Sequence, residues 1–406
     1  MNILTLNAGS NSLKFEIVAA QSGGGFGESL SAGAYDNIGK EHSVFSLLEN
    51  KKALHTEETE IRDYGHAADL LFDWIERGNA TDRRIRNLRD LECIVHRVVH
   101  GADSFDRPAR ITEEVIRRIE ALEEIAPLHN RSALEVIRAA QAKVRSDLPM
   151  MAVFDTVFHR NIPDEAAFYP IPMDLARRHK IRRYGFHGIS HRYLMLRYSE
   201  IANRPIQEVD LVTLHLEGGS SAAAIRNGQS IDTSMGFTPL EGLMMGTRSG
   251  DVDPALVAYL IRKENMDAKS VEEFLNKKCG LLAVSKISAD TRELEKRLSE
   301  KSVGLAVNMF CYRVRKYVGA YLAALGGAEA IVVGGGIGEN TPFMRERIFR
   351  EFDWCGAILN SEQNRTVVDR EGKITTPESS LPIWVIPTQE GLMMAKEAAD
   401  GMARSG

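Results

Sequence analysis

The sequence predicts an α/β protein with two domains, and three observations lead to this fold class. The chain has 406 residues, more than the roughly 250–300 at which single hydrophobic cores stop growing. A plan of strand, small polar turn and returning strand occurs at the beginning of the chain and again in its second half. Finally, the run AIVVGGGIGENTPF joins an apolar strand through glycines to a helix, which is how α/β proteins bring backbone close to a nucleotide.

The two hairpins are the evidence for a duplicated domain. Residues 3–20, ILTLNAGSNSLKFEIVAA, carry apolar stretches on both sides of a small-residue tip, and residues 211–229, LVTLHLEGGSSAAAIRNGQ, repeat that plan. Backbone amides at the Ser10 and Gly219 turns are suited to binding phosphate, and Lys14 follows the first turn as a point charge. The alternative is a chance similarity of two ordinary hairpins.

Helical periodicity and end signals predict the main helices. Residues 111–127 place apolar side chains on one helical face and close with Pro127. Residues 302–325 keep three-to-four spacing over the longest stretch, so we expect a long buried helix there that ends at Gly326. Cap and first-turn pairs predict further helices after Asp253 and Thr341, and the strand IWVIP leads to a last helix over 390–403.

Composition excludes several classes of protein. The chain is 44% hydrophobic and 26% charged, as in ordinary globular proteins, and its formal net charge of -5 provides no basic field for nucleic acid or an anionic membrane. The four cysteines lie far apart, which argues against a zinc site or a disulfide framework and favours a reducing cytoplasm. No apolar run is long enough to span a membrane, and no export signal is expected.

Several polar residues stand in unusual surroundings. The segment 232–254 is long, rich in Gly, Thr, Ser and Met, and without strand or helix periodicity, as in active-site loops, and its Arg248 is placed to meet an anion. Arg97 is flanked by apolar strand residues and is suited to a carboxylate. Asp155 and His187 lie among aromatic residues, where desolvation shifts a pKa. Each of these residues also has an ordinary structural interpretation, as a turn arginine or a hydrogen-bonded core residue.

Taken together, the motifs NAGS, HRVVHG, APLHN, VFDT, RYGFHG, DTSMGFTPLEGLMMGTRSGD, GIGEN and a late T-x-E resemble the acetate kinase family. They follow in unbroken order from residue 1 to 390. The resemblance implies two duplicated actin-like (ribonuclease H-like) ATPase domains with a cleft between them. The first domain would be 1–155, completed by the C-terminal helix 386–406. The second domain, 156–385, would bind nucleotide and form most of the interface of a homodimer.

The resemblance also implies a reaction and a set of roles. ATP would transfer its γ-phosphoryl group in line and reversibly to acetate, giving acetyl phosphate and ADP, with Mg²⁺ or Mn²⁺ as cofactor and no partner beyond these small molecules. The implied catalytic residues are Asp155, His187 and Arg248, and Asn7 and Glu390 would hold the metal. The carboxylate would be bound by Arg97 and its methyl group by Val99, Leu128, Phe186 and Pro239. ATP would be bound by Lys14, His215, Leu216, Glu217, Gly218, Gly219, Asp290, Thr291, Arg292, Gly336, Ile337, Gly338, Glu339 and Asn340.

Elementary chemistry modifies one of these roles. A substrate carboxylate, with a pKa near that of Glu at roughly 4.3, is already ionised at pH 7, so no base is needed to activate it. We therefore expect Asp155 to orient a substrate-binding arginine or a metal-bound water. The main barrier is the approach of two anions, which Arg97, Arg248, His187 and the metal would lower.

Some positions depart from the family pattern. Glu217 and Gly218 stand where HLGNGAS has glycine and asparagine, Lys286 replaces glycine, Arg131 replaces proline, and Gly391 replaces a second acid. A carboxylate near the ATP phosphates predicts altered affinity or choice of the phosphate donor. Two alternatives stay open: a propionate or butyrate kinase with the same chemistry, and a non-catalytic nucleotide sensor on the same fold.

Overall fold

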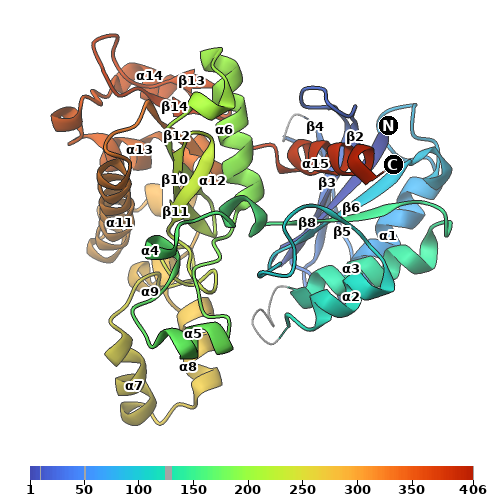
Figure 1. Cartoon of the computed structure of the whole chain (residues 1–406), viewed down its shortest axis with the longest axis horizontal. Helices are drawn as coiled ribbons and strands as arrows, with labels where there is room; N and C mark the ends of the chain where they lie inside the picture. The colour runs from blue at the N-terminus through green and yellow to red at the C-terminus, as the bar shows by residue number, and fades with distance from the viewer. Residues whose placement is uncertain (10, 50–51, 124–129, 406) are drawn as a thin grey trace. The chain divides into compact units, whose positions relative to one another are not determined.

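The computed structural model of the chain describes residues 1–9, 11–49, 52–123 and 130–405 (Figure 1). It divides into two compact units. The first comprises Met1–Val157 and Gln389–Gly406, and the second comprises Phe158–Thr388. No helix in the described ranges is both long and apolar enough to cross a membrane.

The first unit is built on an eight-stranded sheet with the order β5-β4-β3-β2-β1-β6-β8-β7. Its first five strands form an antiparallel meander, whereas β6 and β8 run parallel to β1. The strands are β1 (Asn2–Ala8), β2 (Ser12–Ala19), β3 (Glu28–Asp36), β4 (Val44–Glu49), β5 (Lys52–Glu58), β6 (Cys93–Val98), β7 (Ala109–Arg110) and β8 (Met150–Phe154).

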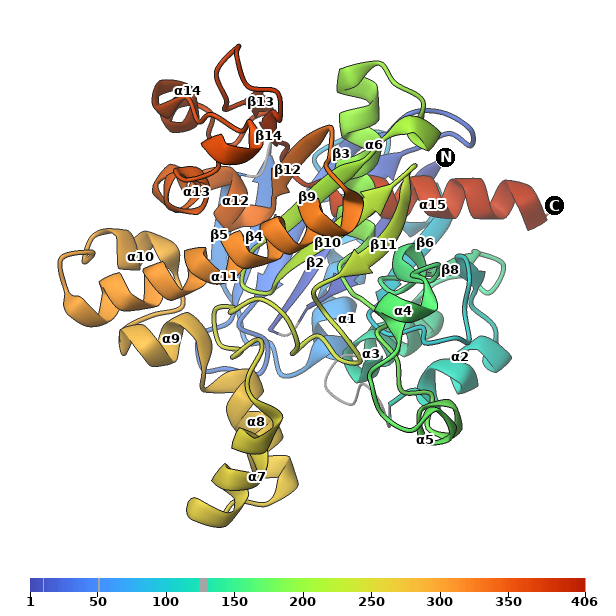
Figure 2. The same cartoon turned by 60° about the vertical axis from the view of Figure 1, so that its left-hand side comes forward.

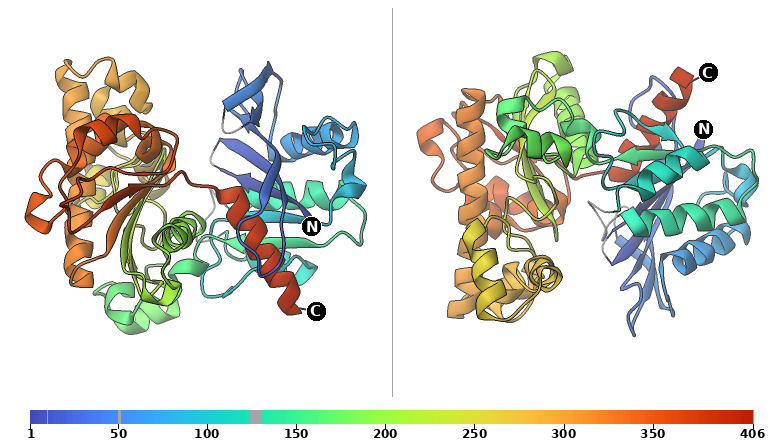
Figure 3. Two further views of the ribbon diagram at one scale, coloured as in Figure 1. Left: turned by 90° about the horizontal axis from the view of Figure 1, so that it is seen from above. Right: turned by 60° about the horizontal axis from the view of Figure 1, so that its bottom comes forward.

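The two faces of this sheet are covered by different parts of the chain. Alternate residues of β1 and β2, including Leu4, Leu6 and Phe15, pack against α1 (Tyr64–Glu76) and α3 (Asn130–Lys143), and α2 (Glu113–Glu120) packs on α3. The opposite face carries Asn7 and is covered by α15 (Glu390–Ser405), the red helix that lies along the blue strands in Figure 3. The short helix η1 (Leu88–Asp90) precedes β6, and η2 (Val157–His159) follows β8.

The second unit is built on a six-stranded sheet with the order β11-β10-β9-β12-β14-β13. Its strands are β9 (Leu211–Leu216), β10 (Ser220–Arg226), β11 (Gln229–Thr233), β12 (Ala330–Gly334), β13 (Gly372–Lys373) and β14 (Ile383–Val385). Three antiparallel strands followed by two parallel ones repeat the plan of β3-β2-β1-β6-β8 in the first sheet. Both predicted hairpins are therefore confirmed, and neither includes an edge strand of its sheet.

Helices cover both faces of the second sheet (Figure 2). The long helix α11 (Lys301–Leu325) packs on β9 and β10, and α6 (Gly188–Ala202) packs on β9 and β12. The predicted helix over 302–325 is confirmed, including its left-handed cap at Gly326. The other helices are α4 (Asp164–Ala167), α5 (Met173–Arg178), η3 (Ile206–Glu208), α7 (Pro254–Lys263), α8 (Ala268–Lys277), α9 (Gly280–Ser285), α10 (Thr291–Glu295), α12 (Gly335–Asn340), α13 (Pro342–Phe349), η4 (Asp353–Cys355) and α14 (Ser361–Thr366).

Lys286 occupies a position whose backbone favours glycine. It caps α9 with φ 62° and ψ 20°, in the left-handed region, where a side chain costs roughly 1–2 kcal/mol. This strain explains why the related family has glycine there. We expect Lys286→Gly to raise the free energy of unfolding by about 0.5–1 kcal/mol, measured by urea denaturation. Lys278→Gly is the matched control, because Lys278 caps α8 with φ −123°, and an equal gain there would contradict the explanation.

Candidate active site

In the first unit, the β1–β2 hairpin fixes the position of Asn7. Asn7 pairs with Lys14 across the antiparallel ladder, and directly opposed residues project from the same face of a sheet. Asn7 and the exposed Lys14 therefore lie side by side on the face that α15 covers. Gly9 N donates to Ser12 O at 2.8 Å and closes the turn, whereas Ser10, the predicted phosphate-binding tip, lies outside the described residues.

A continuous chain of polar contacts runs through this unit from β8 to α15. Arg97 donates from Nε to Asp155 Oδ1 at 3.0 Å and from Nη2 to Asp155 Oδ2 at 2.5 Å. Its Nη1 donates to Asn7 Oδ1 at 2.8 Å, and Asn7 Nδ2 donates to Glu390 Oε2 at 2.8 Å. Since a guanidinium only donates and a carboxylate only accepts, these contacts fix the orientation of the Asn7 amide. The structure brings together four of the predicted site residues.

The pair between Arg97 and Asp155 is deeply buried. The Asp155 side chain is 0% exposed and that of Arg97 is 12% exposed. Both oxygens of the buried carboxylate accept from the guanidinium, and this bidentate contact fixes the orientation of Arg97. Val99, which follows β6, is 6% exposed, and Leu128, the next predicted pocket residue, lies outside the described residues.

Gly391 is explained by a neighbour from β2. A Cβ placed at Gly391 would overlap the carboxylate of Glu16. Glu16 is opposed to Thr5 in the ladder, so its side chain shares the sheet face of Asn7. The Glu16 carboxylate thus occupies the space that a side chain at position 391 would need.

In the second unit, three predicted residues converge at the tip of the β9–β10 hairpin. A Cβ built on Gly219 would lie 3.3 Å from His187 Cε1, 3.4 Å from His187 Nε2 and 3.5 Å from Arg248 Nη1. The imidazole ring of His215 lies 4.7 Å from that of His187. A small residue at the tip, a histidine and an arginine therefore surround one point, which is suited to an oxyanion of a transferring phosphoryl group.

His187 is fixed by its backbone and by the turn before it. It is the N-cap of α6 with φ 56° and ψ 26°, a left-handed conformation that few residues adopt without function or strain. His159 donates from Nε2 to the carbonyl of Phe186 at 3.1 Å, because a carbonyl can only accept. Phe186, a predicted pocket residue, is 1% exposed.

The loop that carries Arg248 is densely packed. Residues 234–253 contain no strand or helix, as predicted, yet their backbone is held at several points. Asp251 accepts from Gly242 N at 2.8 Å and from the hydroxyl of Tyr317 on α11 at 2.7 Å. Gly250 has φ 64°, and a Cβ there would overlap backbone carbonyls of the same loop. Arg248 itself donates from Nη1 to the carbonyl of Pro239, another predicted pocket residue, at 3.2 Å.

The predicted ATP segments surround the same hairpin only in part. Glu217 Oε2 lies 3.5 Å from His215 Nε2, with the Glu217 side chain 44% exposed, and its Cγ lies 3.8 Å from the Cβ position of Gly336. Leu216 is the last residue of β9, and Gly246 N donates to the carbonyl of Gly218 at 3.0 Å. Asp290 instead caps α10 and holds the exposed Arg292 at 2.6 Å, with Thr291 between them 5% exposed.

Glu339 and Thr388 brace the glycine turn after β12. Gly335 N donates to Glu339 Oε1 at 2.9 Å and to Thr388 Oγ1 at 3.0 Å, and Thr388 N donates to Glu339 Oε1 at 2.8 Å. The Glu339 carboxylate is thereby directed into the protein, where it shapes the turn. The other predicted residues of this segment, Ile337, Gly338 and Asn340, lie on α12.

Arg345 is an important residue that sequence reasoning missed. It is fully buried and donates from Nη1 to the carbonyls of Gly338 and Glu339, both at 2.8 Å. Its Nε and Nη2 donate to the side chain and the carbonyl of Asn364 at 2.8 and 2.6 Å. Burial lowers the pKa of Arg345 to about 10, so it stays charged at pH 7. Arg345 therefore ties α12 to α14 beneath the glycine turn.

Buried neutral histidines predict loss of stability in acid. Burial lowers the pKa of His96 to about 3 and that of His159 to about 4. Neither ring nitrogen of His96 has a hydrogen-bond partner in the described part of the chain. Below pH 6.5 these histidines bind protons in the unfolded chain but stay unprotonated in the folded protein. We expect each one to lower the free energy of unfolding by about 1.4 kcal/mol per pH unit as pH falls from 6.5 towards its folded pKa.

This expectation is measured by urea denaturation between pH 7 and 5. His96→Leu should reduce the slope of the unfolding free energy against pH by an amount that corresponds to nearly one bound proton. Replacing the exposed His42 by leucine should leave this slope unchanged. An unaltered slope in the His96 variant would show that this histidine is not the source.

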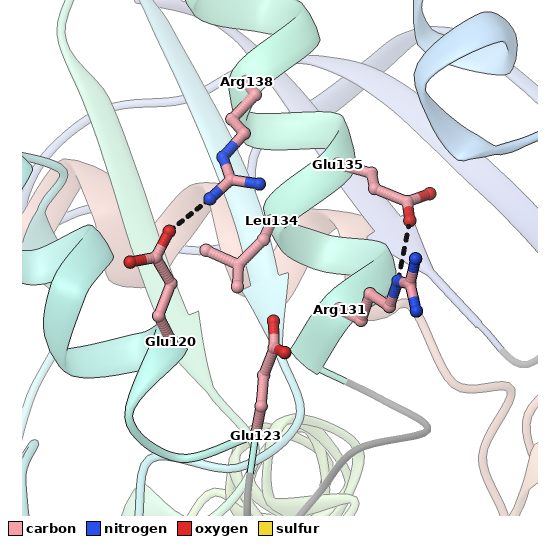
Figure 4. A pocket seen from close by; sticks show the side chains of 6 residues that line it. All are labelled: Glu120, Glu123, Arg131, Leu134, Glu135 and Arg138. Atoms are coloured by element: carbon pink, nitrogen blue, oxygen red, sulfur yellow. Dashed lines mark hydrogen bonds and ion pairs between the residues drawn. The ribbon is translucent and has the colours of Figure 1, made fainter.

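A surface hollow in the first unit lies apart from the candidate site residues. It has a volume of about 350 Å³ and is lined by Glu120, Glu123, Arg131, Leu134, Glu135 and Arg138 (Figure 4). Arg138 pairs with Glu120, and Arg131, which stands where proline is usual, pairs with Glu135 at 3.3 Å. Paired surface charges of this kind contribute little, and the hollow contains none of the predicted site residues.

Two sheets that share a five-strand plan, three antiparallel strands followed by two parallel ones, are typical of actin-like phosphotransferases. Comparison with known proteins narrows the class. The model of the Acetokinase family matches residues 2–396. The curated acetate kinase of Solibacter usitatus is 43% identical over 403 residues, covering 98% of this chain and 97% of that protein. The chain belongs to the acetokinase family.

Solved structures agree with this assignment. The crystal structure of Porphyromonas gingivalis acetate kinase superposes with a TM-score of 0.87 at 35% identity, and each chain is covered completely. A propionate kinase from Francisella tularensis superposes with a TM-score of 0.86 at 34% identity, with 98% of both chains covered. The predicted actin-like fold is confirmed by these relatives.

Proposed function

We propose that this protein is an acetate kinase, which transfers the γ-phosphoryl group of ATP to acetate and catalyses the reverse reaction. Within the site, the main support for this proposal is the buried ion pair between Arg97 and Asp155. Both Asp155 oxygens accept from Arg97, so the carboxylate orients an arginine for an anionic substrate that has no proton to lose. The proposal is supported by the 43% identity to a curated acetate kinase over nearly the whole chain.

The acetate half of the reaction is assigned to Arg97 and an apolar pocket. Arg97 binds the carboxylate, and Val99, Leu128, Phe186 and Pro239 take the methyl group. One methylene is worth only ~1–3 kcal/mol in an apolar pocket, so propionate is a weaker second substrate. The attacking acetate oxygen forms its bond to the γ-phosphorus as the bond to the ADP oxygen breaks.

The ATP half is assigned to Lys14 and to residues of the second unit. The β9–β10 tip (215–219), the α10 cap (290–292) and the α12 segment (336–340) bind the nucleotide. His187 and Arg248 stabilise the phosphoryl group in the transition state of its transfer. Their convergence on Gly219 supports this assignment.

A divalent cation fits this assignment. No group of three or more His, Cys, Asp or Glu side chains is arranged for a metal within the described ranges, but Mg²⁺ is commonly held by one or two carboxylates together with waters and substrate phosphates. Bound Mg²⁺ would neutralise phosphate charge. Glu390 and Asn7 would hold it, and Asn7 Nδ2 also donates to Glu390 Oε2 at 2.8 Å. Mn²⁺ would serve in the same place.

Acyl hydroxamate formation from ATP, Mg²⁺ and a carboxylate tests the function. We expect the highest kcat/KM with acetate in a panel of formate, acetate, propionate and butyrate. Binding of ATP without any turnover would indicate a nucleotide sensor instead. A maximum at propionate or butyrate would reassign the substrate within the same family.

We also place the protein in the cytoplasm as a homodimer with no nucleic-acid or membrane partner. Support for a dimer through the second unit comes from α11, where Leu305 and Tyr312, two turns apart, are 53% and 59% exposed. Exposed apolar stripes of this kind are usual at subunit interfaces. Light scattering should give twice the 45.1 kDa chain mass, and a monomeric mass would refute the dimer.

Glu217 is expected to weaken donor binding. Its carboxylate lies near the Cβ position of Gly336, in the segment assigned to ATP, and a charge there repels phosphate. We expect Glu217→Gly combined with Gly218→Asn to lower KM for ATP by about three- to tenfold and to change the ranking of ATP, GTP and pyrophosphate. Glu200→Gln, a charge removed elsewhere on the second unit, is the control. Unchanged KM values for all three donors would disprove the idea.

A further inference from the structure

A row of three hydrogen bonds leads from His187 into the interior of the second unit. His187 Nδ1 lies 2.9 Å from Ser221 Oγ on β10. The same hydroxyl lies 2.8 Å from His191 Nε2 on α6. His191 Nδ1 in turn lies 2.8 Å from Thr213 Oγ1 on β9. His191, Ser221 and Thr213 are all fully buried, so water does not compete for these contacts.

The number of protons and of partners restricts the row to two arrangements. A hydroxyl has one proton and two acceptor lone pairs, and in the described residues the two imidazoles are the only hydrogen-bond partners of Ser221 Oγ. The buried Ser221 proton is therefore satisfied only if Ser221 donates to one imidazole and accepts from the other. In the first arrangement Thr213 donates to His191, His191 donates to Ser221, and Ser221 donates to His187 Nδ1. In the second arrangement every bond is reversed. The first arrangement leaves the proton of His187 on Nε2, and the second leaves Nε2 without one.

Thr213 decides between the two arrangements. Within the described part of the chain, its hydroxyl has a single hydrogen-bond partner, His191 Nδ1. In the reversed row that nitrogen would be a donor, and the buried Thr213 proton would have no acceptor. An unsatisfied buried donor costs about 1–3 kcal/mol, which favours the first arrangement. Burial, with smaller contributions from His159 and His215, also lowers the pKa of His191 well below its ordinary value, so it stays neutral.

We infer that Ser221, His191 and Thr213 are positioning residues that hold His187 as a neutral imidazole with its proton on Nε2. That nitrogen lies 3.4 Å from the Cβ position of Gly219, where Arg248 Nη1 also converges. His187 is thus a hydrogen-bond donor towards this point, and Arg248 supplies the positive charge. The identity of the acceptor, the phosphoryl group, rests on the proposed function, whereas the tautomer does not.

The tautomer is measured by ¹⁵N NMR of protein labelled at histidine, without substrate, with the His187 signals assigned by their loss in His187→Gln. We expect wild-type His187 to have a protonated Nε2 and an unprotonated Nδ1. The Thr213 hydroxyl is hydrogen-bonded to His191 and not to His187, so Thr213→Val should release the row and give a mixture of His187 tautomers. Thr213→Ser keeps the hydroxyl and should retain the wild-type tautomer. A wild-type His187 protonated at Nδ1, or one tautomer shared by all variants, would overturn the inference.

Kinetics provide a second readout. We expect Ser221→Ala to lower kcat about 10- to 100-fold and to leave KM for ATP and acetate within about twofold, whereas a general loss of structure would raise both KM values and lower the melting temperature. Equal loss in kcat and in both KM values would contradict a positioning role. If the His187 tautomer is as expected but no acetyl phosphate forms, the proposed function is wrong, whereas the inference about the row of hydrogen bonds is upheld.

Discussion

Replacing Arg248 by alanine is expected to lower kcat by about 100- to 1,000-fold while KM for ATP changes by less than about threefold. The guanidinium converges with His187 Nε2 on Gly219 and is held from a loop whose backbone is fixed by Asp251 and Tyr317. An arginine fixed before the substrate arrives stabilises charge most when the phosphoryl group is between its two oxygens. Initial rates at saturating acetate over a range of ATP concentrations measure the effect.

Two further variants sharpen this test. Arg248→Lys keeps the charge but loses the planar fork, so an intermediate kcat is expected. Arg204→Ala removes an arginine that pairs with Glu208 and Glu329 on the surface of the second unit and should leave both constants unchanged. A rise in KM for ATP with kcat unchanged on Arg248→Ala would mean that Arg248 binds the ground state as tightly as the transition state, and this would contradict the proposed role.

Asp155→Asn is expected to lower kcat/KM for acetate by about 100-fold, mostly through KM. Asparagine offers the guanidinium one acceptor where Asp155 offers two, and its amide group would face donors. The buried Arg97 charge would lose its counterion, which costs about 3–5 kcal/mol of stability. Kinetics with varied acetate and urea denaturation measure the two effects.

The control for Asp155 is a surface carboxylate of the same unit. Asp73 pairs with Lys143 at 2.7 Å with its side chain 49% exposed, and Asp73→Asn should change stability by less than about 1 kcal/mol. If Asp155 instead accepts a proton in catalysis, its replacement would lower kcat at unchanged KM for acetate. That result would contradict the orienting role.

Features that depend on local sequence could be predicted. The two hairpins follow from apolar stretches around small-residue tips, and α7 begins at the predicted cap, where the Asp253 side chain accepts from Ala255 N at 2.8 Å. Periodicity also identified α11. The same signals could not show that α7 has no buried residue, because exposure depends on what packs against a helix and not on its own pattern.

Features that depend on distant partners could not be predicted. The role of Arg345 requires that residues 338, 364 and 367 meet around one side chain, and no spacing in the sequence indicates this. Ser221 and His191 are separated by 30 residues along the chain, and each alone is an ordinary core residue. The overlap of Glu16 with the Gly391 position is likewise invisible without the fold. Resemblance to a family supplied the candidate residues, and the structure supplied the reason for their geometry.

The placement of α15 has a consequence for how the protein matures. This helix covers the sheet face that carries Asn7 and brings Glu390 to it, but it is translated after the entire second unit. While a ribosome is still synthesising the polypeptide, β1 and β2 lack the helix that covers them, and Asn7 lacks its hydrogen-bond partner Glu390. The first unit therefore cannot be completed until the last residues are made, so a truncated chain that ends before residue 389 would have an uncovered sheet face without Glu390 on it.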